Sequence, residues 1–457
     1  MIAIRVLALV CLSIHLMLGA GTRMQKSGWI EVHLEGTPRE IGQQHGRLLA
    51  PEIADGLRAI QTVVTHDTKK DWDFYRTAAK DILWPKVEAE YQEELEGIAA
   101  GLKERGSKLD LWDVVALNGW MELAWYYVPV FDKKSGIPTP SSVTAPEHCS
   151  AFIATGSFTK DGKIVIAHNA WVDYAIGERW NIIFHIKPAK GEKIIMDGYP
   201  GLIHSGTDFG INSAGIVITE TTITAFTGFD PAGIPEFVRA RKALQYGNSI
   251  DEVVRIFKEG NNGGYANAWM MGDRKTNEIA RLELGLKNVR LERSTDGYFV
   301  GSNFPIQPKL IEEEAKDFDP KDLSASPTAR RIRWEQLMKE NRGKIDIKMA
   351  QRFMADSMDS FDNKIEPDER TLCGRIDLSP RGSGSWQPAY GPAGAVQNKA
   401  ADDGMLARLA FTAAYGPQCG PAFKAADFLK AHPDFEYQKT VLRDMPSQGW
   451  VEFRSQK

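Results

Sequence analysis

Cys149 stands where a cysteine could act as a nucleophile. It follows residues 128–148, which contain four prolines and no periodicity, and it precedes SAFIATGSF, whose alternation predicts a strand. Proline-rich segments of this kind are exposed, and chains are commonly cleaved in them. Cleavage before Cys149 would give the thiol a neighbouring α-amino group with a pKa of about 8, which can accept the thiol proton. The ordinary alternative is a small buried cysteine that only packs in the core.

Other catalytic motifs are absent from the sequence. GINSAG around Ser213 misses Gly-x-Ser-x-Gly by one residue, which argues against an α/β-hydrolase. No His-Glu-x-x-His occurs and the nine histidines are scattered, so a zinc hydrolase is not expected. The glycine-rich residues 260–267 lack the Lys and Ser/Thr of a phosphate loop, and we expect a turn there. We therefore expect no metal and no cofactor.

The composition is that of a globular protein. The chain has 457 residues, of which 43% are hydrophobic and 25% charged, with a net charge of −4. Acidic and basic residues are interspersed and form no basic stripe, so we expect no nucleic-acid partner.

The N-terminus predicts export. Residues 1–20 contain Arg5, an apolar run from Val6 to Leu18 and a small residue at Ala20, which is typical of a cleaved secretory signal peptide. An uncleaved anchor is the alternative, although the run is short for a membrane span. No later segment is long and apolar enough to cross a bilayer. The absence of Asn-x-Ser/Thr favours a periplasmic or secreted bacterial protein over a lysosomal glycoprotein.

Export leaves three cysteines in the mature chain, namely Cys149, Cys373 and Cys419. An odd number in an exported protein suggests one disulfide and one free thiol. A Cys373–Cys419 bridge is plausible in an oxidising compartment, and it would leave Cys149 free.

The residue patterns predict an α+β domain with a helical N-terminal segment. Strand alternation at 29–36 is followed by Thr37-Pro38-Arg39-Glu40, which has the form of a helix cap. We expect residues 21–127 to be mainly helical, 128–148 to be a linker, and 149–457 to form the catalytic part. In that part we expect a tight Asp161-Gly162 hairpin. Further strands are expected at 181–188, 192–224, 267–285 and 288–303, and helices at 235–258, from 326, and at 405–416.

Several motifs together resemble the phospholipase B-like family, a branch of the N-terminal-nucleophile hydrolases distantly related to penicillin acyltransferase and bile-salt hydrolase. They are HCSAFI (148–153), AHNAW (167–171), YPGLIHSGTDFGI (199–211), GIVITETTI (215–223), NAWMM (267–271), SPTARR (326–331) and RIDLSP (375–380). Upstream, GTPREIGQQHGRLLAPEI (36–53) is similar to the entry helix of these precursors. The resemblance implies a four-layer αββα sandwich and self-cleavage of the His148–Cys149 bond, with Cys149 as the nucleophile.

The resemblance also implies roles for other residues. Asn267 matches a position where relatives place an oxyanion donor, the alternative being a turn residue. His168 could hold the new amine, assist proton transfer or be structural, and Asn169 could orient the amine or tie down a strand end. Trp171 would form a pocket wall. The remaining candidates are Thr221 or Thr222 as a polar contact, since alternation turns only one inward, and Arg375, which could bind an acidic head group or pair with Glu220.

These expectations lead to one enzymatic and one non-enzymatic hypothesis. The first is an exported, self-processed hydrolase that removes a fatty-acyl group from phospholipid through an acyl-thioester on Cys149, with the two fragments remaining associated. The same chemistry would serve an N-acyl amide hydrolase or an acyltransferase. The second is a non-catalytic lipid-binding protein in which Cys149 is never exposed by cleavage.

Overall fold

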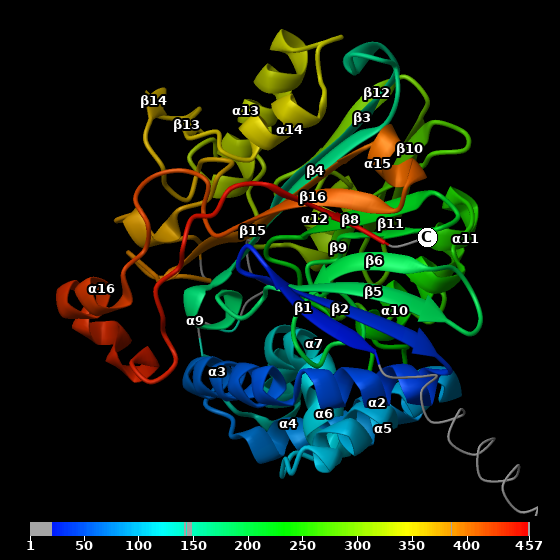
Figure 1. Cartoon of the computed structure of the whole chain (residues 1–457). Helices are drawn as coiled ribbons and strands as arrows, with labels where there is room; N and C mark the ends of the chain where they lie inside the picture. Colours follow the sequence, from blue (N-terminus) through cyan, green and yellow to red (C-terminus); the bar gives the residue numbers. More distant parts are fainter. Residues whose placement is uncertain (1–20, 141–142, 144–148, 385, 456–457) are drawn as a thin grey trace, which may run out of the picture.

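The computed structural model describes residues 21–140, 143, 149–384 and 386–455 (Figure 1). The expected signal peptide and residue His148 therefore lie outside the described residues. In the described part of the chain, no helix is long and apolar enough to cross a membrane.

Two large β-sheets form the centre of the molecule. The first has nine strands in the order β1 (Thr22–Lys26), β2 (Trp29–Gly36), β5 (Ile182–Pro188), β6 (Ile194–Gly198), β7 (Gly210–Asn212), β8 (Ile216–Thr222), β9 (Asn267–Asp273), β10 (Glu278–Leu284) and β11 (Val289–Ser294). The second has six, in the order β12 (Gly297–Gly301), β3 (Ser150–Thr155), β4 (Val165–Asp173), β15 (Ala393–Asp402), β16 (Ala410–Tyr415) and β17 (Val451–Arg454). Neighbours are antiparallel except β2 and β5, which are parallel.

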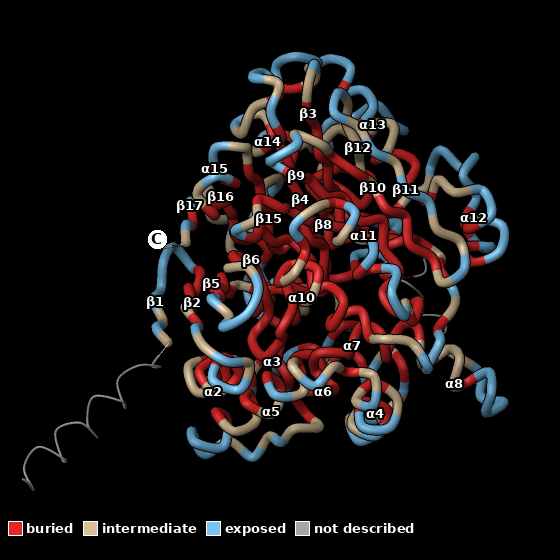
Figure 2. Tube along the Cα trace, turned by 90° about the vertical axis from the view of Figure 1, so that its right-hand side faces the viewer, coloured by how far each residue is buried: buried red, intermediate tan, exposed pale blue. Residues whose placement is uncertain are grey.

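The sheets pack face to face around a shared core. Strand β3 contacts β8, β9 and β10, and β12 contacts β9 and β10. At Gly272 of β9 an added Cβ would lie 3.0 Å from Ile153 of β3 and 3.1 Å from Ile164, which shows how closely the two layers approach. Figure 2 shows this central region as mainly buried backbone, with exposed residues gathered at loops and outer helix faces.

Helices cover the outer faces of the sheets. Helices α10 (Glu236–Tyr246) and α11 (Ile250–Lys258) contact β7 to β10, whereas α13 (Ser326–Glu340) contacts β12 and α14 (Ile347–Phe353) contacts β4 and β15. The expected α+β class is confirmed by this arrangement.

The N-terminal segment contributes both helices and strands. The Thr37–Glu40 capping box begins α2 (Pro38–Leu48), and Pro51 lies in the first turn of α3 (Ala50–Thr68). Figure 1 shows these helices gathered below the sheets with α4 (Trp72–Ala78), α5 (Ala89–Glu104) and α6 (Leu111–Asn118). The glycines of α2 and α5 allow close packing, since a Cβ at Gly42 would lie 1.9 Å from the Glu94 carbonyl oxygen.

The structure differs from the sequence expectations in several elements. Residues 405–416 are not one helix, because α15 (Asp403–Ala407) ends before Leu409 at a φ of 52° and strand β16 follows. The β3–β4 hairpin is closed by residues 156–164 with a 3-10 turn at Gly156–Phe158, not by a two-residue turn at Asp161-Gly162. The expected linker begins with a helix, α8 (Val128–Ser135).

Candidate active site

Cys149 lies directly before β3, in the space where the two sheets meet. Its side chain is buried, and it is the only free cysteine among the described residues. Its φ of 81° is in the left-handed region, which is unusual for a residue other than glycine. Burial first, and then the Glu220 carboxylate, raise the pKa of the Cys149 thiol. The thiol is therefore neutral in this uncleaved chain and needs a base before it can attack a carbonyl.

Two side chains fix the backbone around Cys149. Arg330 of α13 donates from Nη1 to the Cys149 carbonyl at 2.6 Å and from Nη2 to Asn303 Oδ1 at 2.8 Å. Asn169 Oδ1 accepts the Ser150 amide at 2.9 Å, and Asn169 Nδ2 donates to the Leu372 carbonyl at 2.7 Å. The Asn169 side chain therefore links the start of β3 to the loop that contains Leu372. This agrees with the expected structural role, in which Asn169 ties down the end of a strand.

Trp171 belongs to the same frame. Its Nε1 donates to Asn169 Oδ1 at 3.0 Å, and the Arg330 guanidinium lies 4.3 Å from its ring centroid, in cation–π contact. Both side chains are fully buried. The motif SPTARR was recognised in the sequence, but no role was predicted for Arg330, and no local pattern indicates that its side chain is buried beside Cys149.

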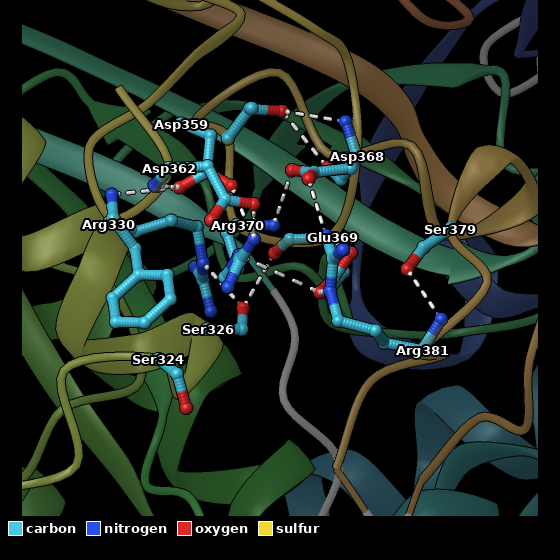
Figure 3. A network of polar contacts seen from close by, with 12 residues as sticks. Ser324, Ser326, Arg330, Asp359, Asp362, Asp368, Glu369, Arg370, Ser379 and Arg381 are labelled. Atoms are coloured by element: carbon cyan, nitrogen blue, oxygen red, sulfur yellow. Dashed lines mark hydrogen bonds and ion pairs between the residues drawn. The ribbon is translucent and has the colours of Figure 1, made fainter. Parts of the chain in front are cut away.

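Arg330 also connects Cys149 to a charged loop region (Figure 3). Its Nε donates to Ser326 Oγ at 3.0 Å, and Ser326 Oγ donates to the Glu369 carbonyl at 2.6 Å. Arg381 then binds the side chains of Glu369, at 2.7 Å, and Asp368, at 2.6 Å. The position of Cys149 thus depends on the fold of residues far along the chain.

An acidic side chain and an imidazole face the thiol. Glu220 Oε1 lies 3.9 Å from Cys149 Sγ and accepts a hydrogen bond from Tyr265 Oη at 3.1 Å. One nitrogen of His168 lies within 4.8 Å of both the thiol and the Glu220 carboxylate. Burial and then the Asp208 charge raise the pKa of Glu220. Burial and then Lys399 lower the pKa of His168, which keeps the imidazole neutral and makes it a weaker base.

Lys399 is a buried cation that sequence reasoning missed. It lies opposite His168 in the β4–β15 register, and its Nζ is 3.3 Å from Asp197 Oδ2, 3.1 Å from Thr207 Oγ1 and 2.6 Å from Gln397 Oε1. Burial lowers the pKa of Lys399, and Asp197 opposes this shift. A lone lysine in a strand of small residues was the available signal, since lysine is rarely buried without a partner.

The candidate oxyanion residues lie on adjacent strands. Thr222 of β8 and Asn267 of β9 are paired directly in the register, whereas the Thr221 side chain lies within 2.6 Å of a Cβ added at Gly301 in the other sheet. Alternation therefore separates the two threonines, as expected. Among the described residues, the amide of Asn267 and the hydroxyls of both threonines have no hydrogen-bond partner, although all three are buried.

Arg375 does not take part in this cluster, so the expected pairing with Glu220 is wrong. Its Nε and Nη2 donate to Asp377 at 2.9 and 2.8 Å, and its Nη1 donates to the carbonyls of Cys419 and Pro421. These bonds use most of the hydrogen-bond donors of the guanidinium, and the side chain is buried. Cys419, whose backbone carbonyl accepts one of these bonds, forms a disulfide with Cys373.

A small cavity of about 10 Å³, lined largely by apolar and aromatic side chains, lies beside Cys149. Its lining comes from both sides of the expected cleavage site and includes Trp120, Met121, Trp125, Trp171, Trp180 and Tyr265. Trp120 and Trp125 pack edge to face with ring centroids 5.0 Å apart. The cavity is far smaller than an ordinary ligand pocket, so a substrate larger than water would need these walls to move apart.

Three groups of side chains have the spacing of metal ligands among the described residues. They are Cys149–His168–Glu220, His204–Asp208–Glu236 and Glu31–His33–His185, with one ligand atom of each residue within 4.8 Å of the others. In the third group the imidazoles of His33 and His185 are stacked 4.1 Å apart and nearly parallel. The lone pairs of an imidazole lie in the plane of its ring. Because the two stacked rings are nearly parallel, their lone pairs do not converge on one point, and a single ion could bind both only after one ring rotated.

Comparison with known proteins places these residues in a family. The family model for Phospholipase B matches residues 57–285, which is half of the chain. Human "Phospholipase B-like 1" is 24% identical over 80% of this chain and 69% of the relative. An "Uncharacterized protein" of Archaeoglobus fulgidus is 25% identical over 54% of this chain and 42% of the relative.

A further relative, the "Putative phospholipase B-like 2" of Bos taurus, is 34% identical over a shorter stretch, 28% of this chain and 24% of the relative. The chain therefore spans less than half the length of the archaeal and bovine proteins. The matched residues 57–285 include the nucleophile candidate, His168 and Asn267. The chain belongs to the phospholipase B family.

Proposed function

We propose that the chain is a cysteine N-terminal-nucleophile hydrolase that cleaves itself before Cys149 and then hydrolyses acyl ester or amide bonds. Membership of the phospholipase B family suggests a hydrolase. The observation that carries the proposal is Cys149, the only free cysteine in the described part of the chain. It precedes β3, borders a small apolar cavity, and has its backbone carbonyl held by Arg330. Two facing sheets with outer helices are compatible with the αββα sandwich of such enzymes.

Self-cleavage would use the same thiol. Cys149 Sγ attacks the carbonyl carbon of residue 148, the peptide nitrogen leaves as the α-amine after taking a proton, and water then hydrolyses the thioester. The left-handed φ of Cys149 costs of order 1–3 kcal/mol in an L-residue. Cleavage would release that strain, because φ no longer constrains a chain that begins at this residue.

The acyl reaction would follow once the amine is free. The amine accepts the thiol proton, the thiolate attacks the substrate carbonyl, and the leaving alcohol or amine departs with a proton. Water then resolves the acyl-thioester and returns the free thiol. The unpartnered amide of Asn267 and hydroxyl of Thr222 are suited to hold the oxyanion, and each such donor is worth about 3 kcal/mol. Neutral His168 would hold the new α-amine through a hydrogen bond.

A fatty-acyl substrate is supported by the names of the relatives, which refer to phospholipase activity. The apolar side chains around Cys149 would suit a hydrocarbon chain only after the small cavity widens, because it is nearly closed in the uncleaved chain. Amides remain chemically equivalent substrates at a thiolate, and transfer to an amine differs only in the second nucleophile. Because Trp120 and Trp125 precede the cleavage site, the two fragments would have to stay together to form this pocket. We propose a secreted or periplasmic location.

The test is the N-terminus and mass of purified protein. Active enzyme should contain a chain that starts Cys-Ser-Ala-Phe and makes up about two thirds of the 50.9 kDa precursor, so about 34 kDa. Cys149→Ala should remain one chain and should not hydrolyse phospholipid or N-acyl amides, whereas Cys149→Ser should be cleaved more slowly. Normal processing of Cys149→Ala would exclude self-cleavage. An intact wild-type chain that binds lipid without turnover would favour a binding protein.

A further inference from the structure

A second buried cluster lies beside the loop that borders the Cys149 pocket. His204 and Asp208 belong to the segment between β6 and β7, and Glu236 is the first residue of α10. All three side chains are buried almost completely. The loop between His204 and Asp208 contains Gly206 and Thr207, both of which line the pocket.

The distances in this cluster are too long for good hydrogen bonds. His204 Nδ1 lies 3.5 Å from Asp208 Oδ1 and 3.6 Å from Glu236 Oε2. With metal–ligand bonds of about 2.0–2.2 Å, the ligand atoms of a tetrahedral site are separated by about 3.3–3.6 Å. The spacing therefore matches the edges of a tetrahedral metal site.

Several polar atoms of these side chains have no protein partner. Both ring nitrogens of His204, Oδ2 of Asp208 and Oε1 of Glu236 have no hydrogen-bond partner among the described residues. Buried polar atoms of this kind are costly unless something else satisfies them. Asp208 also has a φ of 51°, so the loop accepts an unfavourable conformation while placing this carboxylate.

A further acidic side chain and a guanidinium lie next to the cluster. A third carboxylate, that of Glu122, accepts the Glu236 amide at 2.9 Å. The nearby Arg239 donates to the carbonyls of Ile234 and Phe257 and to the Asn262 amide oxygen, and no carboxylate is among these acceptors. Three carboxyl groups, one imidazole and one guanidinium therefore lie buried close together, and the carboxyl and imidazole atoms are suitable ligands for a divalent cation.

We propose that His204, Asp208 and Glu236 bind a divalent transition-metal ion, with zinc as the best match to one imidazole and two carboxylates. The ion joins the loop that lines the pocket to the first turn of α10. Tyr265 extends this connection, because its hydroxyl lies 3.3 Å from the Gly206 carbonyl and 3.1 Å from Glu220. Since the site is buried, the ion enters as the chain folds and becomes part of the folding free energy.

The experiment measures metal in the full chain carrying Cys149→Ala, which removes the thiol of the neighbouring cluster. The protein is unfolded in guanidinium and refolded with a chelator, with Zn²⁺ or with Co²⁺, and bound metal is measured by mass spectrometry. We expect about one ion per chain, a higher melting temperature with Zn²⁺ than with the chelator, and a Co²⁺ spectrum of nitrogen and oxygen ligands. A chain that refolds equally well with no bound ion would overturn the proposal.

Two isosteric variants locate the ion. In the same background, Asp208→Asn and Glu236→Gln should bind Zn²⁺ about tenfold more weakly or worse, and their melting temperatures should no longer respond to it. Glu31→Gln is the matched control in the third cluster and should bind as before. Binding lost in the control but kept in both variants would assign the ion elsewhere. If the variants fail to fold, the ion content and Co²⁺ spectrum of Cys149→Ala alone decide.

Discussion

The charge of Glu220 should control how readily Cys149 ionises. At 3.9 Å, a carboxylate and a thiolate repel by about 4 kcal/mol at an effective dielectric constant of about 20. Glu220→Gln removes this charge and keeps the shape and the Tyr265 contact. It should therefore lower the pKa of the Cys149 thiol. At the same pH, the ratio of thiolate to thiol should be at least about tenfold higher than in wild type. A tenfold change needs only about 1.4 kcal/mol of that repulsion.

The pH range of the effect follows from Glu220 itself. Burial and Asp208 raise the pKa of Glu220, so its carboxyl is protonated at low pH and then resembles glutamine. Wild type and Glu220→Gln should accordingly agree at low pH and separate as Glu220 ionises. The separation should grow with pH until the wild-type thiol also ionises.

The assay is the ultraviolet absorbance of the thiolate across a pH titration, with the same protein blocked at its thiol as the blank. Protein beginning at residue 21 has Cys149 as its only free thiol, because Cys373 and Cys419 are joined. Glu283→Gln is the control, since Glu283 is buried but accepts the amides of Ile306 and Gln307. Coincident curves for wild type and Glu220→Gln, or a shift to higher pH, would refute this reasoning.

Two further changes test the frame of the site and its stability. Arg330→Lys keeps the charge but loses hydrogen bonds to the Cys149 carbonyl and its neighbours. Urea unfolding should show that the free energy of unfolding falls by about 2–4 kcal/mol, and the uncleaved fraction on a denaturing gel should rise. Unchanged cleavage would count against an anchoring role for Arg330. Burial raises the pKa of Asp173 to about 7, so the folded state binds its proton more tightly and stability from this group is present below about pH 4 and lost as pH rises through 7. The difference in unfolding free energy between Asp173→Asn and wild type should therefore shift in favour of the variant by up to about 4 kcal/mol between about pH 4 and pH 8. The same difference at both pH values would contradict this.

Local signals predicted much of the fold. The capping box at Thr37 fixed the start of α2, and the alternation at 29–36 matches β2. The strand β15 and the strand at 410–415 were missed because their small residues have little β-propensity, and pairing with neighbouring strands decides their conformation. No local pattern indicates that residues 22–36 join a sheet with strands beyond residue 181.

The candidate site was predicted in part. Motifs on β3, β4 and β9 contain the nucleophile candidate and the residues expected around it. Arg330 and Lys399 were missed because each contacts the site from a segment more than 180 residues away in the sequence. Arg375 was misplaced for the converse reason, since a carboxylate two residues away in its own segment binds it more directly than the distant Glu220.

The parallel pairing of β2 with β5 has a consequence for the cleaved protein. It runs from Ile30 opposite Ile182 to Gly36 opposite Pro188, so an internal ladder of the sheet would be intermolecular after the cut. Refolding of the separated fragments would then be a second-order process, whereas refolding of the precursor is first-order. Recovery of the native heterodimer from denaturant should therefore slow on dilution. The N-terminal fragment would guide folding of the rest of the chain only while the two are still covalently joined, that is, once per molecule.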